Sequence, residues 1–201
     1  MPLTFRLPRN RITRAVDAFD AEVDAWFDHL RGNPVADRVF YAASALGDHG
    51  LIWLILGALR GLRGSDHDWH AAVRVGAGVG IESAVVNLGI KSLFRRKRPV
   101  FDGARPLALR TPRTSSFPSG HATSAFTAAG LLSEDDDLWP IYYAIALVVA
   151  WSRVHVKIHH ASDVVAGIAV GIALGRLGRR LRPLPFPPDA GGSESRAPLR
   201  S

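Results

Sequence analysis

Three groups of basic, hydroxyl and imidazole side chains lie at the borders of apolar segments in this chain of 201 residues. The first is KSLFRRKRP at residues 91–99, and the second is FPSGH at residues 117–121. The third begins with SR at residues 152–153 and continues to His159 and Asp163. Polar residues at the rim of apolar helices are costly, so their clustering indicates a function.

The cations and the small residues of these groups are suited to binding a tetrahedral dianion. Lys91, Arg98 and Arg153 could surround one phosphate, and guanidinium groups give paired hydrogen bonds to its oxygens. The proline before Ser119 and Gly120 favours the first turn of a helix, where free N–H groups attract an anion. Gly120 would allow the backbone to come close, and the Ser119 hydroxyl could donate one more bond.

The imidazoles and the carboxylate are suited to phosphoryl transfer. His159 and Asp163 are four residues apart, so they are neighbours on one helical face if the helix begins by His159. A carboxylate at Nδ1 would fix the tautomer and leave Nε2 free to attack phosphorus. His121 would then act across the phosphate as general acid, and afterwards as general base for water.

A metal site is the alternative for the histidine-rich segment, because His155 and His159 share a helical face and His160 follows. No acidic partner like that of a His-Glu-x-x-His motif is present, and the role at His159 explains Asp163. The chain also has no cysteine. We therefore expect neither a metal nor another cofactor.

The elements that must position these residues are apolar segments at about residues 39–62, 71–94, 119–132, 138–155 and 162–177. They predict an all-α fold, a polytopic membrane bundle with about five transmembrane helices. The third and fifth are short for a membrane span, so we expect them to be shielded by neighbouring helices or shortened at an active-site pocket. Gly167, Gly171 and Gly175 would let helices approach closely.

Residues 15–30 predict an additional N-terminal amphipathic helix, at the membrane surface or against the bundle. We expect one membrane-embedded domain at residues 15–182, between disordered tails at residues 1–14 and 183–201. The first apolar segment is interrupted at residues 47–50. Asp48 and His49 are there either supporting residues of the site or a hydrated break in the helix, and the sequence does not decide between these two. The acidic residues 133–137 are expected in a solvated loop on the face away from the three clusters.

Alternating directions of the five spans would bring the three clusters together. The end of the second span, the start of the third, the end of the fourth and the start of the fifth would then share one membrane face. The order of the segments alone makes this prediction.

The motifs K-x6-R-P, P-S-G-H and S-R-x5-H-x3-D between Lys91 and Asp163 resemble the three-part signature of the type 2 phosphatidic acid phosphatase family. That family shares its helical fold with vanadium-dependent haloperoxidases and bacterial acid phosphatases. The resemblance implies a metal-independent lipid phosphatase with a phosphohistidine intermediate. It also implies that His159 is the nucleophile, Asp163 its orienting residue and His121 the acid and base. The phosphate-binding residues would be Lys91, Arg98, Ser119, Gly120 and Arg153.

Two other functions remain open at this point: a haloperoxidase that holds vanadate in the phosphate pocket, and a non-catalytic protein that binds lipid phosphates. The substrate is not readable from the sequence. Candidates are phosphatidic acid, phosphatidylglycerol phosphate, a polyprenyl phosphate or diphosphate, and a prenyl-linked sugar phosphate.

The net charge of +7 comes from basic residues that flank apolar blocks. This placement favours contact with a lipid bilayer over nucleic acid.

The composition suggests a bacterial multi-pass protein of the inner membrane, and the family resemblance implies an active site that faces away from the cytoplasm. The positive-inside rule favours the opposite side, because cations gather on the predicted active face. They are six arginines (Arg6, Arg9, Arg11, Arg14, Arg31 and Arg38) and seven further basic residues at 95–113. The oligomeric state is not predicted.

Overall fold

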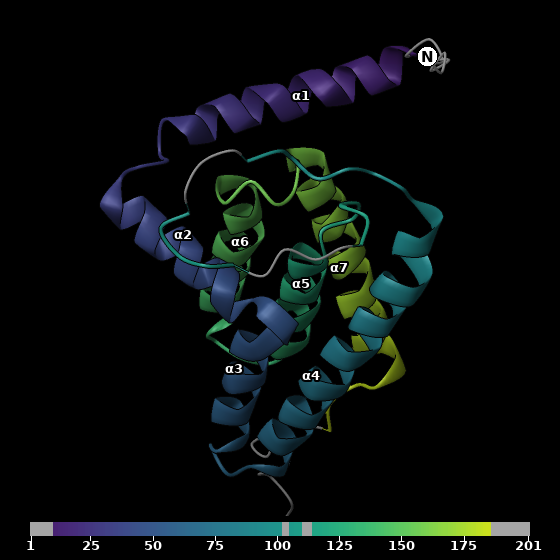
Figure 1. Ribbon diagram of the computed structural model, residues 1–201. Helices are drawn as coiled ribbons and strands as arrows, with labels where there is room; N and C mark the ends of the chain where they lie inside the picture. The colour runs from purple at the N-terminus through teal and green to yellow at the C-terminus, as the bar shows by residue number, and fades with distance from the viewer. Residues whose placement is uncertain (1–9, 102–104, 110–113, 186–201) are drawn as a thin grey trace, which may run out of the picture.

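The computed structural model describes residues 10–101, 105–109 and 114–185, and all the regular structure in these ranges is helical. Helices α3 (Leu51–Gly61), α4 (Asp66–Ala84), α5 (Gly120–Leu132), α6 (Trp139–His155) and α7 (Ala161–Leu181) form a bundle. Helices α1 (Arg11–Asp28) and α2 (Pro34–Leu46) lie at one end of this bundle, and α1 runs across it (Figure 1).

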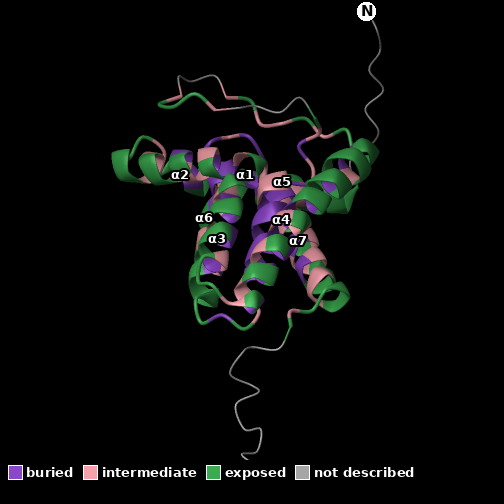
Figure 2. Ribbon diagram, turned by 90° about the horizontal axis from the view of Figure 1, so that it is seen from below, coloured by how far each residue is buried: buried purple, intermediate pink, exposed green. Residues whose placement is uncertain are grey.

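Helix α5 is the centre of the bundle and packs against α4, α6 and α7. Every residue from Ala122 to Leu132 is buried, and the core of the molecule lies along this helix (Figure 2). Its 13 residues span only about 20 Å, less than the hydrocarbon thickness of about 30 Å. As predicted, neighbouring helices shield this short apolar segment.

Glycines of α7 allow that helix to lie directly on the backbone of α5. A Cβ atom at Gly167 would lie 2.6 Å from the carbonyl oxygen of Ser119, and one at Gly171 would lie 2.5 Å from that of Thr123. No side chain fits at such distances. The spacing of four residues therefore places both glycines on the face of α7 that contacts the start of α5.

The first apolar segment is a broken helix. Helices α2 and α3 meet at an angle of 66° around the turn Asp48–Gly50. His49 and Gly50 have positive φ angles of 55° and 70°, which end one helix and begin the next. The end of α2 lies against the start of α5 and the last turns of α6, where Ser44 contacts His121 and Arg153. The interruption seen in the sequence therefore redirects the chain.

Fewer of the described helices are long and apolar enough to cross a membrane than the predicted count of about five. By length and composition, two of the described helical stretches could cross a membrane, Asp66–Leu93 and Ala161–Leu181, and a third if α2 and α3 count as one bent span. The first of these includes α4, a π-helical turn at Val85–Gly89 and a 3-10 turn at Ile90–Leu93. Helices α5 and α6 have 13 and 17 residues, fewer than the 18 required here of a membrane-spanning helix. The count of about five is therefore not confirmed.

Helix α1 begins at Arg11, within the tail that was predicted to be disordered through residue 14. Asn10 is the physical reason, because its side chain accepts a hydrogen bond from the Thr13 amide at 2.8 Å and caps the helix. The predicted tails otherwise lie almost wholly outside the described residues, at 1–9 and 186–201.

The end of the bundle opposite α1 is held by ion pairs. Asp136 was expected in a solvated loop, but it is buried, pairs with Arg63 at 2.8 Å and accepts a hydrogen bond from Tyr142 at 2.8 Å. Arg74 pairs with Glu134 at 2.6 Å and donates to the carbonyl of Leu131. The acidic loop therefore neutralises Arg63, which follows α3, and Arg74 of α4, and the sequence pattern did not reveal this.

Candidate active site

The three polar clusters meet at the end of the bundle that α1 covers. The Ser119 amide donates to the carbonyl of Asp163 at 3.0 Å, so the starts of α5 and α7 are joined. Arg98 donates to the carbonyl of Ile158 at 3.0 Å, which attaches the segment after α4 to the turn between α6 and α7. The alternating order of the helices produces this convergence, as the sequence predicted.

His159 is buried in the turn before α7, with its two ring nitrogens in different surroundings. Nε2 lies 3.1 Å from Nη1 of Arg98. A guanidinium group can only donate, so Nε2 must accept and the neutral ring carries its proton on Nδ1. Nδ1 lies 3.6 Å from Oδ2 of Asp163, longer than a normal hydrogen bond but close enough for the carboxylate to orient the ring.

Burial lowers the pKa of His159 from 6.5 to about 3, against the opposing influence of Asp163, and the positive charges of Arg153 and Arg98 lower it further. The imidazole is therefore neutral at physiological pH. A neutral ring with its lone pair on Nε2 is the form that can act as a nucleophile.

Arg153 and Arg98 have buried N–H groups that lack an acceptor among the described residues. Arg153 uses Nη1 to donate to the Ser44 hydroxyl, while its Nε and Nη2 are unpaired. Nε of Arg98 is also unpaired. Unpaired buried donors cost free energy, and those of a charged group cost most. Such donors next to a buried imidazole are a suitable environment for an anion.

Lys91 and Gly120 lie side by side, as the phosphate-binding hypothesis requires. The buried Lys91 ammonium donates to Oδ1 of Asn87 at 3.0 Å and lies 3.4 Å from the position that a Cβ of Gly120 would occupy. Ser119 is the N-cap of α5, and its hydroxyl accepts a hydrogen bond from the Ala122 amide. The first turn of α5 and a buried cation thus meet at one point.

His121 lies in the first turn of α5 and is held by the broken segment between α2 and α3. Its Nε2 is 3.1 Å from the carbonyl oxygen of Ser44 and 3.2 Å from Oδ1 of Asp48. Because both partners are acceptors, this nitrogen carries a proton. The hydroxyl of the same Ser44 accepts a hydrogen bond from Arg153, so Arg153 and His121 meet at this residue. All eight residues predicted for the site therefore lie at this end of the bundle.

Sequence reasoning missed three residues that hold the site, Ser44, Arg96 and Asp20, and left the role of a fourth, Asp48, open. Arg96 donates to Oδ1 of Asp163 at 2.7 Å and also pairs with Asp20 of α1. The interruption at residues 47–50 was a visible signal for Asp48. Nothing distinguished Arg96 within its basic run, or Asp20 among the other acids of α1.

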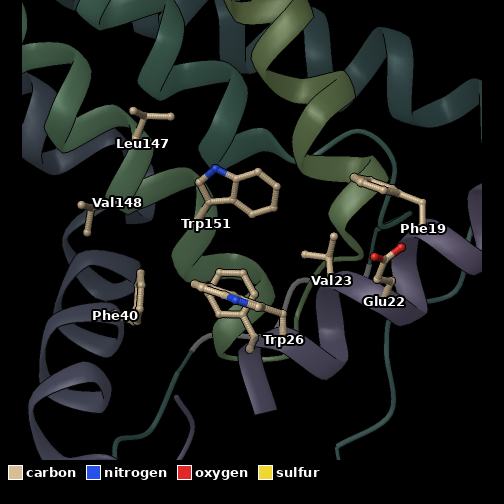
Figure 3. A pocket seen from close by; sticks show the side chains of 9 residues that line it. Phe19, Glu22, Val23, Trp26, Phe40, Leu147, Val148 and Trp151 are labelled. Atoms are coloured by element: carbon tan, nitrogen blue, oxygen red, sulfur yellow. The ribbon is translucent and has the colours of Figure 1, made fainter. Parts of the chain in front are cut away.

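Helix α1 separates two cavities. One of about 450 Å³ contains His159, Arg96 and Lys97 on one side and three acids of α1 on the other: Asp17, Asp20 and Asp24. The other, of about 660 Å³, is an apolar groove between α1, α2 and α6 (Figure 3). Phe19, Val23 and Trp26 of α1 and Trp151 of α6 line it. Helix α1 therefore presents acids to the site and apolar side chains to the groove.

His155 does not join His159 in a shared metal site. Its Nε2 lies 2.7 Å from Oδ1 of Asp37, and its ring stacks on Phe40 with centroids 4.6 Å apart. No group of three or more potential metal ligands was found in the part of the chain that the structure describes.

Comparison with known proteins gives one family. A model of the PAP2 superfamily matches residues 71–184, a range that contains all eight predicted site residues. The decaprenylphosphoryl-5-phosphoribose phosphatase of Mycobacterium tuberculosis is 37% identical over 136 residues, which cover 67% of this chain and 73% of that protein.

Solved structures share the fold. The Aquifex aeolicus LpxE structure superposes with a TM-score of 0.61 at 23% identity, covering 80% of this chain and 94% of that one. The PAP2-type phosphatidylglycerolphosphate phosphatase of Bacillus subtilis gives a TM-score of 0.58 at 23% identity, covering 86% of this chain and 87% of that one.

Proposed function

Because the chain belongs to the PAP2 superfamily, we propose that it removes phosphate from a membrane lipid through a covalent intermediate on His159. It is a lipid phosphatase, like the relatives it matches. The observation that carries the assignment of the site is the buried neutral imidazole of His159 beside unpaired donors of Arg98 and Arg153.

In the first step Nε2 of His159 attacks phosphorus, and the bond between phosphorus and the leaving oxygen breaks. His121, which enters this step as the imidazolium, gives a proton to that oxygen and becomes neutral. The leaving group is the lipid alcohol, or a lipid phosphate if the substrate is a diphosphate, and its leaving oxygen is protonated. Asp163 stabilises the positive charge that develops on the His159 ring. Lys91, Arg98 and Arg153, with Ser119 and the backbone at Gly120, hold the phosphoryl oxygens.

In the second step water attacks the phosphohistidine. His121, now neutral, takes a proton from the water, and the bond between phosphorus and Nε2 breaks. Inorganic phosphate leaves, and both imidazoles return to their starting forms. Each step needs only these side chains and water.

The substrate we favour is a polyprenyl-linked sugar phosphate. The relative with this kind of substrate in its name is 37% identical and aligns with 73% of its own length. Relatives named as a lipid A 1-phosphatase and an undecaprenyl-diphosphatase match smaller shares of this chain, 63% and 40%. The chemistry at His159 is the same for all of these substrates.

The protein is membrane-bound, and we propose that it is a multi-pass protein of a bacterial inner membrane with the site facing away from the cytoplasm. The cations near the site weaken the positive-inside argument for the other side. Arg31, Arg98 and Arg105 donate to backbone carbonyls at this end of the bundle, and Arg96 pairs with two carboxylates. Their charges serve the fold and the site, so they are poor indicators of orientation.

The test is phosphate release by the purified protein in detergent from a panel of lipid phosphates, with and without EDTA. We expect release from at least one polyprenyl-linked phosphate, unchanged by EDTA, and none from His159→Ala. Unchanged release from His159→Ala would overturn the mechanism. A wild-type protein that binds these lipids without releasing phosphate would be a non-catalytic binder, and halide oxidation dependent on added vanadate would indicate a haloperoxidase.

A further inference from the structure

Asp163 is held by more than its partner histidine. Its side chain is fully buried, Oδ1 accepts from Nη1 of Arg96 at 2.7 Å, and Oδ2 accepts from the His160 amide at 2.9 Å. These two bonds fix the plane of the carboxylate and leave Oδ2 directed toward Nδ1 of His159. The orientation of the nucleophile therefore depends on where Arg96 lies.

Arg96 is in turn held by α1. Its Nη1 also donates to the Ser162 hydroxyl at 2.7 Å, and its Nη2 donates to Oδ2 of Asp20. The guanidinium thus bridges two carboxylates, one next to the nucleophile and one on α1. A planar group with several fixed donors is suited to this bridge, and an ammonium group is not.

Asp20 also caps α7 from outside. Oδ1 accepts from the Ser162 amide at 2.7 Å, one of the free N–H groups in the first turn of that helix. Oδ2 accepts from the Ser162 hydroxyl at 2.9 Å. Asp20 is buried, although it belongs to a helix whose other acids are more exposed.

We propose that Asp20 and Arg96 are positioning residues for the His159–Asp163 pair, so that α1 is part of the catalytic apparatus. This inference rests on the proposed role of His159 as nucleophile. Arg96 pairs with two carboxylates, those of Asp20 and Asp163. Without Asp20, Arg96 would pair with Asp163 alone and draw the carboxylate away from the imidazole. The ring would lose both its orientation and part of the stabilisation of its positive form.

The first experiment compares Asp20→Asn with Glu22→Gln, which removes the same charge from an exposed position of the same helix. Asparagine can still accept from the Ser162 amide, so the cap on α7 is retained while the link to Arg96 is lost. We expect kcat of Asp20→Asn to fall about 10- to 100-fold with KM changed less than about threefold, as for supporting residues around other reactive groups. Glu22→Gln should match wild type. Wild-type kcat in Asp20→Asn would overturn the proposal.

The second experiment separates positioning from a purely structural role. If Asp20 acts through Asp163, then adding Asp20→Asn to Asp163→Asn should change the residual activity little. The Asp163→Asn variant already lacks the carboxylate through which Asp20 would act. Losses that multiply would overturn the proposal. Should Asp20→Asn fail to fold, Arg96→Lys replaces it in both experiments, with the same expectations. A wild-type protein inactive on every lipid phosphate would instead refute the proposed function.

Discussion

At the scale of single residues, the donors of Arg153 would determine what the proposed site binds. The side chain is buried, one nitrogen is used by Ser44, and Nε and Nη2 point to no acceptor within the described ranges. A lysine at this position would keep the charge but could not present two N–H groups in one plane.

We therefore predict that Arg153→Lys lowers kcat/KM about a hundredfold, the typical loss when a donor to a developing oxyanion is removed. Inhibition by inorganic phosphate should weaken as well, because the same donors would bind the product. Arg176→Lys, at an exposed position of α7, is the matched control and should behave as wild type in both assays. Equal kcat/KM in the two variants would contradict the proposal that Arg153 binds phosphate.

The eight residues of the proposed site could be predicted from the sequence because their types and spacing suit the chemistry. The sequence could not predict the residues that hold them, since their contacts join distant parts of the chain. Asp20 lies 142 residues before Ser162, and Ser44 lies 109 residues before Arg153. An aspartate in an amphipathic helix has the pattern of a solvated residue until the fold buries it.

At the scale of elements, the contact between α5 and α7 sets the spacing of the site. Ser119 and Asp163 lie at the starts of these two helices and are joined by a backbone hydrogen bond of 3.0 Å. Gly167 and Gly171 keep the helices this close, because any side chain there would meet the α5 backbone. The small residues were visible in the sequence, but which helix they contact was not.

Gly171→Ala should therefore destabilise the protein, because its Cβ would lie 2.5 Å from the Thr123 carbonyl oxygen and 2.8 Å from the Phe126 Cβ. Overpacking of this kind costs about 1–3 kcal/mol. Gly80→Ala is the control, since no atom of the described residues lies within 4 Å of its Cβ position on α4. There the gain in helix propensity should leave stability equal or higher. Thermal unfolding in detergent micelles measures both, and equal midpoints would contradict the close contact.

The helix break at Asp48–Gly50 shows a limit of pattern reading at this scale. Two glycines around an acid and a histidine predicted an interruption, and the structure has one. The 66° bend and the contact of Asp48 with His121 follow from packing against α4 and α5, where a Cβ at Gly50 would meet Val79 at 2.6 Å. Local sequence does not encode such a direction.

At the scale of the whole molecule, the two ends of the bundle differ. One end has α1 and the proposed site with its arginine side chains. The other end has the ion pairs of Arg63 with Asp136 and of Arg74 with Glu134. If the site faces away from the cytoplasm, then the ion-paired end faces the cytoplasm.

The absence of cysteine from the sequence makes this orientation measurable. We expect Glu22→Cys, on α1, to react with a membrane-impermeant maleimide in spheroplasts, whose inner membrane is still closed. Asp137→Cys, in the loop at the other end, should react only after the membrane is opened. Both positions are exposed, so accessibility within the protein does not limit either reaction. The reverse pattern would place the site in the cytoplasm.

The covalent phosphohistidine is the central claim, and its direct capture is the most direct test. Substrate labelled in the phosphoryl group is mixed with His121→Gln enzyme, in which attack of water is slow, and the reaction is stopped in alkaline detergent. A substrate with a good leaving group removes the need for an acid in the first step. We predict an acid-labile label that mass spectrometry locates on His159, and none in His159→Ala. A label on another residue, or rapid turnover with no labelled protein at any time, would contradict the account.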